Sequence, residues 1–492
     1  MNERWWRVIY DHLPVWGQNA AISVYGLGWR RKKQGGVFRE ALEFLLASEK
    51  WSLAELRNYQ DERLRELVRH AYETTPYYRE LFDSLKLTPG DVRSVDDLPK
   101  LPILTRQTLR DRFESMISRG WPKRRVVRGR TGGTTGIPRW LVEDRDTWCW
   151  NWAIVWRHRR RFGLSPNDSH VSFGGRVSVV PLGRDDRPFW RRNLASHQIY
   201  ISSHYLTLAN MPKLIDYLQQ HPVDYYCGYP SALNLVAQFL LEHDIRLAHP
   251  PKAVISNSGI LQAWQCAAMR KALSPRVGDL YGQTEHCGII SNCEEDAYHV
   301  DMELGVMEFL PLEGIESDAR QIICTALHNP VMPLIRYEVG DLATPLEDGG
   351  VCACGRASTR VASIDGRVES YVMTPDGRRI SRLDYVLTTR GAIRQAQFVQ
   401  LALDRLTVKI VRGPGYGNAD ERRLLRDLRL FLGDRIAIEF EYVEEIPCEA
   451  NGKFRQVISH IVRPGSTRMQ ADGSGETARA SGAGSSHERV SS

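Results

Sequence analysis

The sequence predicts an α/β protein, with layered sheets and helices in a large N-terminal part and a small α+β unit after it. Three observations support this. The 492 residues, 42% hydrophobic and 25% charged, have the composition of a globular chain that buries a sizeable core. Short β-rich runs alternate with helical runs between residues 126 and 341, and the composition changes after Gly355. Collagen-like and wholly disordered classes are therefore excluded.

The first hundred residues are predicted to be helical, most clearly over 53–82, and to form a packing layer. In that stretch Leu and Val side chains recur at spacings of three and four, at Leu56, Leu64, Leu67, Val68 and Ala71. A tryptophan-rich start precedes it, interrupted by Pro14 and Gly17 and followed by a basic run. We expect core packing, rather than an interfacial anchor, for Trp5, Trp6, Ile9 and Trp16.

The next elements alternate as expected for α/β layers. Strands are predicted at 171–173, 223–228 and 253–257, with a helix over 231–243. Further on, strands at 408–411 and 436–443 enclose a helix over 420–432, which suits a small α+β unit. We divide the chain into residues 1–120 (helical), 121–365 (nucleotide- and acyl-binding core), 366–464 (small domain, with a hinge near 365–370) and 465–492 (disordered tail).

Charge and cysteine usage limit the functional classes. The net charge of +7 is modest for this length, and the usual nucleic-acid-binding signatures are missing from the sequence, so no nucleic-acid partner is predicted. No apolar run is long enough to span a membrane, and any membrane contact is expected to be peripheral at most. The nine cysteines, an odd and scattered set, indicate reduced thiols or metal ligands and a cytoplasmic protein.

A glycine- and threonine-rich segment, 130–138, is the sharpest local signal. It lies between a β-like run and a helical run and has the sequence Arg-Thr-Gly-Gly-Thr-Thr-Gly-Ile-Pro. Glycines let backbone N–H groups turn toward an anion, and threonine hydroxyls add donors, so the segment suits a phosphate cradle. A flexible turn is the alternative. It is not a Walker A loop, because no Gly-Lys-Ser/Thr follows at the required spacing.

Four further motifs follow in order: Leu280-Tyr-Gly-Gln-Thr-Glu285, Leu334-Ile-Arg-Tyr-Glu-Val-Gly-Asp341, Ile364-Asp-Gly-Arg-Val-Glu369 and Ala450-Asn-Gly-Lys-Phe-Arg455. Together with the glycine–threonine segment they resemble the adenylate-forming superfamily, in its phenylacetate-CoA ligase and CapK-like branch. A Leu-Pro-Lys-Leu-Pro-Ile-Leu-Thr run at 98–105 and Cys-Ala-Cys-Gly-Arg at 352–356 add to the resemblance.

The resemblance implies a large adenylate-forming domain, a small mobile C-terminal domain and a two-step reaction. A carboxylate attacks the α-phosphate of ATP to give an acyl-adenylate, and the thiol of coenzyme A then displaces AMP. The implied cofactors are ATP, Mg²⁺ and coenzyme A, and the substrate is a small-molecule carboxylic acid. Transfer to a carrier protein or an amine, or a nucleotide-binding zinc protein that has lost catalysis, are the alternatives. The sequence leaves the acid and the oligomeric state open.

The resemblance also implies site residues. The implied donors to the phosphates are Thr131, Gly132, Gly133, Thr134, Thr135 and Gly136. The implied catalytic residues are Lys453, Glu285, which is also the Mg²⁺ ligand, and Thr134. The adenine neighbours are Tyr281, Gly259 and Ile260, the ribose and α-phosphate neighbours are Asp341 and Arg367, and the further nucleotide-binding residues are Gly282 and Thr284. For Asp341 a helix cap is the alternative.

A metal site is predicted beside the nucleotide motifs. Cys293 and His299 form one pair and Cys352 and Cys354 another, and four such ligands from two loops suit a closed, structural Zn²⁺ site. His286 and Cys287 are rival ligands, and free thiols are the alternative. A basic run over 157–161 is predicted to be a solvated helix face, with binding of the nucleotide phosphates of coenzyme A or of an acidic partner as the alternatives.

Overall fold

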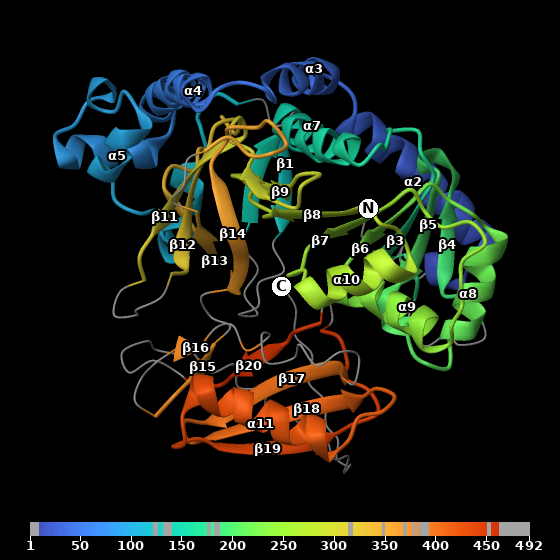
Figure 1. The fold of residues 1–492 in the computed structure, drawn as a ribbon. Helices are drawn as coiled ribbons and strands as arrows, with labels where there is room; N and C mark the ends of the chain where they lie inside the picture. The colour runs from blue at the N-terminus through green and yellow to red at the C-terminus, as the bar shows by residue number, and fades with distance from the viewer. Residues whose placement is uncertain are drawn as a thin grey trace, which may run out of the picture.

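The computed structural model describes residues 9–121, 126–130, 140–174, 179–181, 187–312, 318–346, 350–367, 371–375, 379–380, 383, 393–449 and 454–461. Figure 1 shows a large part built around one broad sheet, and a smaller unit below it that contains the last strands. This is the predicted α/β architecture. The predicted tail, 465–492, lies outside the described residues.

Helices cover the start of the chain. They are α2 (Val15–Lys33), α3 (Phe38–Ser48), α4 (Leu53–Thr74), α5 (Pro76–Leu85) and α6 (Arg106–Asp111), with short 3-10 segments at Pro89–Asp91, Val95–Lys100 and Phe113–Met116. Helix α4 starts in a capping box between Ser52 and Glu55. Its five predicted apolar positions are all buried, as expected. The helical stretch nevertheless divides at Thr75, because the residue before Pro76 disfavours the helical conformation, and α5 begins at that proline.

The large sheet has twelve strands in the described part of the chain, in the order β11-β12-β13-β14-β10-β9-β8-β7-β6-β3-β5-β4. Strands β5, β3, β6, β7 and β8 run parallel. The bounds are β3 (His170–Gly174), β4 (Trp190–Asn193), β5 (Gln198–Ser202), β6 (Tyr225–Gly228), β7 (Ala253–Asn257), β8 (Val277–Gly282), β9 (Ile289–Asn292), β10 (Tyr298–Val300), β11 (Gly305–Leu310), β12 (Arg320–Ala326), β13 (Tyr337–Pro345) and β14 (Arg360–Arg367).

Four helices accompany this sheet: α7 (Arg145–Arg161), α8 (Met211–Gln220), α9 (Pro230–Glu242) and α10 (Ala263–Ala272), with 3-10 segments at Leu194–Ser196 and Ser203–Tyr205. The predicted strands at 171–173, 223–228 and 253–257 and the helix over 231–243 correspond to β3, β6, β7 and α9. Apolar side chains of α8, α9 and α10 form one buried cluster with those of β3, β5, β6 and β7.

The smaller unit has its own core. Its sheet has the order β19-β18-β17-β20, and α11 packs on it. Phe398, Val408 and Leu424 are among the fully buried side chains between them. The bounds are β15 (Val372–Met373), β16 (Arg379–Ile380), β17 (Ile393–Ala402), β18 (Arg405–Arg412), α11 (Asn418–Leu432), β19 (Ala437–Tyr442) and β20 (Val457–Ser459). The strands and the helix predicted here are present.

The two strands that flank the glycine–threonine segment form a hairpin. Strands β1 (Val126–Arg130) and β2 (Trp140–Asp144) pair antiparallel, with Arg130 opposite Trp140. The segment therefore connects two strands, whereas the sequence predicted a strand before it and a helix after it. The helix, α7, starts only after β2, capped by Asp144. The six candidate phosphate donors, 131–136, lie outside the described residues.

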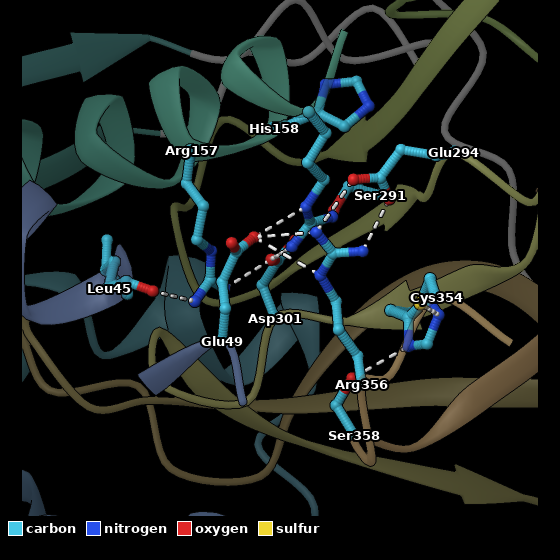
Figure 2. A network of polar contacts seen from close by, with 12 residues as sticks. Leu45, Glu49, Arg157, His158, Ser291, Glu294, Asp301, Cys354, Arg356 and Ser358 are labelled. Atoms are coloured by element: carbon cyan, nitrogen blue, oxygen red, sulfur yellow. Dashed lines mark hydrogen bonds and ion pairs between the residues drawn. The ribbon is translucent and has the colours of Figure 1, made fainter. Parts of the chain in front are cut away.

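The basic run at the end of α7 contradicts the prediction of a solvated face. Arg157 is 2% exposed and pairs with Asp301 at 2.6 Å and Glu303 at 2.6 Å. His158 is buried as well, and Arg161 pairs with Glu49 at 2.9 Å. Figure 2 shows Arg157, Asp301 and Glu49 gathered in one network. The charges are buried because acidic partners from distant segments neutralise them.

The N-terminal apolar residues also differ from the prediction of core packing. The Trp16 side chain is 76% exposed and that of Ile9 is 50% exposed. Trp5 and Trp6 lie outside the described residues. For Trp16 the reason is the orientation of α2, which places polar side chains against the protein.

Candidate functional site

A cavity of about 330 Å³ lies between the large part and the smaller unit. The large part contributes the ends of β7, β8 and β14 and the middle of β13, and the smaller unit contributes residues of β17 and of the segment before β20. In open α/β sheets ligands bind beyond the carboxyl ends of the parallel strands, which is where β7 and β8 end here. The lining residues that the sequence singled out are Gly259, Ile260, Tyr281, Gly282, Asp341 and Arg367.

Asp341 is the centre of the polar groups in this cavity. It lies on β13 opposite Arg367 of β14, and the Arg367 Nε is 3.2 Å from Asp341 Oδ1. The Tyr281 hydroxyl donates to Asp341 Oδ2 at 2.8 Å, and Gln283 donates to that hydroxyl at 3.1 Å. Burial raises the pKa of Asp341, although the Arg367 guanidinium acts in the opposite direction. Burial also raises the pKa of Tyr281, which keeps its hydroxyl a donor.

The two residues proposed to lie along a base are placed at the end of β7. Gly259 follows Ser258, which has a left-handed φ of 62°. A Cβ on Gly259 would lie 3.0 Å from Cδ of Pro230, so this turn packs closely against the start of α9. Ile260 is 41% exposed and reaches Gly366, which with Arg367 forms the other wall.

Glu285 lies a short distance further along the chain, after β8. The Tyr337 hydroxyl donates to Glu285 Oε1 at 3.2 Å, which fixes one carboxylate oxygen. Thr284 is exposed and does not line the cavity, unlike Gly282. The next residue, His286, contacts Glu143 Oε2 through Nδ1 at 2.7 Å. Glu143 belongs to β2, so this contact ties the Glu285 turn to the hairpin that carries the glycine–threonine segment.

An ion pair holds the smaller unit against the large part beside the cavity. Arg394 at the start of β17 pairs with Glu242 of α9 at 2.5 Å, which joins the two parts. Within the smaller unit, Gln397 donates to the Arg455 carbonyl at 2.8 Å and so fixes the segment before β20. Lys453 lies outside the described residues. Its chain neighbours Phe454 and Arg455 line the cavity.

Four predicted metal ligands come together in a separate cluster. The ligand atoms of Cys293, His299, Cys352 and Cys354 all lie within 4.8 Å of one another. The Cys293 and Cys352 sulfurs are 4.0 Å apart, and Cys354 Sγ is 3.5 Å from His299 Nε2. A tetrahedral zinc site with bonds of about 2.3 Å has edges of about 3.8 Å, so the spacing fits. Two separate segments supply the pairs, the β9–β10 hairpin and the segment between β13 and β14.

The surroundings of the cluster suit a bound cation. His299 Nδ1 lies 3.1 Å from Ser358 Oγ, which directs Nε2 toward the sulfurs. Burial, with Arg161 and Arg356 nearby, lowers the pKa of His299 to about 4, so the imidazole is in its neutral, ligating form. Burial raises the pKa of Cys293 to about 12. Burial opposes ionisation of Cys354 too, but hydrogen bonds from Arg356 outweigh it and lower that pKa.

The rival ligands lie elsewhere. His286 contacts Glu143, and the Cys287 sulfur lies 3.7 Å from Gln283 Oε1. Arg356, in the loop that holds Cys352 and Cys354, pairs with Glu294 at 2.6 Å and with Glu49 at 3.3 Å. Figure 2 shows that Arg356 joins this loop to the acidic and basic side chains around α7.

Sequence patterns gave no sign of several of these contacts. Three of these residues, Glu143, Glu242 and Arg394, fall outside every motif. Two others, Gln283 and Tyr337, lie inside motifs but were given no role. Their partners lie up to 152 positions away in the sequence. Only the three-dimensional arrangement brings them together.

Comparisons with known proteins place the fold in a structural class. The fold matches that of adenylate-forming coenzyme A ligases: a solved structure of 2-hydroxyisobutyryl-CoA ligase in its postadenylation state aligns with a TM-score of 0.65 at 17% identity, covering 84% of this chain and 91% of that one. The model of the CapK C-terminal domain matches residues 372–460.

Sequence relatives then narrow the assignment. Protein CapK of Staphylococcus aureus is 24% identical over 460 residues, 92% of this chain and 99% of that protein. A phenylacetate-coenzyme A ligase of Aromatoleum evansii is 27% identical over 421 residues, 78% of this chain and 90% of the relative. The chain is therefore a homologue of CapK and of phenylacetate-coenzyme A ligases, and the resemblance found in its motifs is confirmed.

Proposed function

We propose that this chain is an ATP-dependent acid–thiol ligase, which activates a carboxylic acid as an acyl-adenylate and transfers the acyl group to coenzyme A. The single observation that carries the proposal is the arrangement of Asp341, Tyr281 and Arg367 in a cavity that the CapK C-terminal domain completes. The relatives, among them phenylacetate-coenzyme A ligases, support the same reaction.

In this proposal Asp341 binds the ribose. A carboxylate is an acceptor only, so it suits the two hydroxyls of a ribose. Tyr281 and Arg367 hold its two oxygens at 2.8 Å and 3.2 Å and so fix the orientation of the carboxylate. The Tyr281 ring, anchored by its own hydroxyl, then presents a face to the adenine beside Gly259 and Ile260. Arg367 also brings positive charge toward the α-phosphate.

The phosphates are assigned to the hairpin end of β1 and β2. The backbone and hydroxyl donors of residues 131–136 would bind the β- and γ-oxygens, with Thr134 nearest the reacting group. Glu285 offers the carboxylate oxygens that Mg²⁺ prefers, and its fixed position beside Tyr337 fits that role. When bound, Mg²⁺ would neutralise phosphate charge. The His286–Glu143 contact holds the two segments together.

Lys453 is proposed to stabilise the adenylation step. An ammonium on a flexible stem can interact with both the attacking carboxylate and the α-phosphate. The position of its neighbours Phe454 and Arg455 in the cavity wall supports this role. The C-terminal domain is proposed to rotate about residues 365–370 between the two half-reactions, which would remove Lys453 and admit the thiol.

A panel of carboxylic acids tests the function. With ATP and the purified chain, at least one aryl, short or long acid should give acid-dependent exchange of labelled pyrophosphate into ATP. Adding coenzyme A should then release AMP in stoichiometry with thioester. Exchange without coenzyme A-dependent AMP release would favour a carrier protein or an amine as acceptor. ATP binding without exchange on any acid would contradict the proposal and favour a nucleotide-binding protein that has lost catalysis.

The cysteine and histidine cluster is proposed to hold a structural Zn²⁺. All four positions of a tetrahedron are supplied by protein side chains, which is typical of structural rather than catalytic zinc. The ion would fix the β9–β10 hairpin to the segment before β14, and β14 carries Arg367 at its end. The metal would therefore support the ribose site from a distance and take no part in the reaction.

A further inference from the structure

Helix α2 is oriented with its polar side toward the protein. Asn19 Oδ1 accepts the Arg192 backbone N–H at 2.9 Å, and Ser23 Oγ accepts the Leu194 N–H at 3.0 Å. Both donors belong to the terminal strand β4 and its end, so the helix satisfies the open edge of the large sheet. Figure 1 shows α2 beside β4 at that edge.

The contact face extends along the whole helix. A Cβ on Gly26 would lie 2.5 Å from the Asn193 side chain, so only glycine permits this close approach. Further along, Arg30 donates to the Ala195 carbonyl at 3.2 Å. The four residues of this face, at spacings of four, three and four, are Asn19, Ser23, Gly26 and Arg30.

The side of α2 that adjoins this contact face carries a stripe of apolar side chains exposed to solvent. The stripe consists of Trp16, Ala20, Val24 and Leu27, at spacings of four, four and three, and the exposed Arg31 follows four residues later. Trp16 is 76% exposed and Val24 75%. Tyr25 and Leu194, also exposed, flank the stripe. Exposed apolar residues arranged in a continuous row on one helix mark an interaction surface.

The charge around this stripe indicates which kind of partner binds it. Helix α2 contains no acidic residue, and its last turn holds four basic residues. Arg31 is exposed beside the stripe, whereas Arg30 bonds to the Ala195 carbonyl and the Lys32 and Lys33 ammonium groups lie over the Trp29 ring. A second copy of the chain would bring like charges together at this end, whereas an anionic lipid surface would attract them. Trp and Tyr side chains favour the boundary between headgroups and acyl chains. In the described part of the chain no helix has the length and hydropathy needed to cross a bilayer, which leaves a helix lying in the surface plane.

We propose that the α2 stripe, Trp16 to Arg31, docks the protein on a membrane surface rich in anionic lipid. The apolar side chains enter the headgroup region and the exposed Arg31 guanidinium pairs with a lipid phosphate. Because the contact face with β4 is polar and internal, docking requires no rearrangement of the helix. This surface lies at the far edge of the sheet from β14, apart from the nucleotide cavity.

Vesicle co-sedimentation of the full chain tests the proposal. We expect binding to phosphatidylcholine vesicles that contain about 30% phosphatidylglycerol, weakening at high ionic strength. Val24→Glu should reduce the partition coefficient at least about tenfold, and Arg31→Ala should reduce it roughly fivefold. Leu401→Glu, the same change at a 66% exposed position on β17, is the matched control and should bind as the wild type does.

Four results would overturn the proposal. The first is no sedimentation with anionic vesicles, and the second is equal binding to neutral vesicles. The third is a concentration-dependent dimer that Val24→Glu abolishes without lipid, which would identify a second copy as the occupant. If deletion of residues 1–8 were needed to reveal binding, those residues would be the resident occupant, which also contradicts the proposal. Circular dichroism and pyrophosphate exchange establish that each variant is folded.

Discussion

Asp341 combines burial with a function that needs its charge. The side chain is 8% exposed, and burial raises its pKa while Tyr281 and Arg367 act to keep it ionised. Binding of a nucleotide requires the ionised form, because a protonated carboxyl loses acceptor capacity. The site therefore depends on a few surrounding donors, which makes it sensitive to single substitutions.

Asp341→Asn is expected to weaken ATP binding on the order of 100-fold, because two hydrogen bonds to a charged acceptor are lost at about 1.5 kcal/mol each. Titration calorimetry with ATP measures the change. Asp404→Asn, at an exposed position on the smaller unit, is the control and should leave the affinity unchanged. Equal affinity of the Asp341 variant and the wild type would remove Asp341 from the nucleotide site.

The pH dependence of ATP binding should reflect the raised pKa of Asp341. A raised pKa means that Asp341 takes up its proton at a higher pH than an ordinary aspartate does. Affinity for ATP should therefore fall as the pH decreases through that raised value, before ordinary carboxylates titrate. Asp341→Asn should lack this component of the pH profile. An identical profile in the variant would assign the titration to another group.

Individual site residues differ in how far the sequence could predict them. Asp341, Tyr281 and Arg367 each stand in a short motif with a recognisable chemistry, and the structure brings all three together. Glu143 could not be predicted, because its partner His286 lies 143 positions away and a lone glutamate in a strand has no pattern. Lys453 and residues 131–136 stay predictions.

Among the helices, α7 shows why a local charge pattern can mislead. A run of arginines predicts a solvated face, but its partners Asp301 and Glu303 follow more than 140 positions later and cannot be paired by spacing. The result is a buried ion network that joins α7 to the end of α3, to the strand β9 and to the segment after β10.

Arg157→Met is expected to lower the free energy of unfolding by about 3–5 kcal/mol, because it leaves Asp301 and Glu303 buried without their partner. Urea unfolding followed by tryptophan fluorescence measures this. The matched control is Arg160→Met, at an exposed position three residues after Arg157 in the same helix. It should change the free energy of unfolding by about 0.5 kcal/mol or less. Similar losses in both variants would mean that the pair contributes nothing specific.

The two metal-binding segments behave as one unit in the proposed site. The wild-type chain should contain one zinc ion per molecule by elemental analysis, and Cys352→Ser should lose it and unfold at a lower temperature. Cys266→Ser, at a cysteine outside the cluster, is the control and should retain the metal. A metal-free wild type with the thermal stability of Cys352→Ser would favour free thiols.

At the scale of the whole molecule, the fold class and the family resemblance were predicted from the order of the motifs more than from any single motif. The alternation of β-rich and helical runs predicted an α/β protein, and the strands β3, β6 and β7 and the helix α9 occur where the patterns placed them, whereas the segment after residue 138 forms the strand β2 in place of the predicted helix. Sheet order and the meeting of both units at one cavity were not predictable from periodicity, since they depend on contacts such as Arg394 with Glu242. The placement of the domain boundary at 365–366 stays a prediction.

The central claim is that residues hundreds of positions apart serve one ATP molecule, with Lys453 acting from the C-terminal unit. Pyrophosphate exchange with an active acid, compared between Lys453→Ala and Lys409→Ala, tests it most directly. Lys409 is a lysine of the same unit, paired with Glu441 at 3.5 Å, so it matches the charge that is removed. We predict that Lys453→Ala reduces the exchange rate by on the order of 100-fold or more while ATP still binds, and that Lys409→Ala does not. Equal exchange in the two variants would contradict the account.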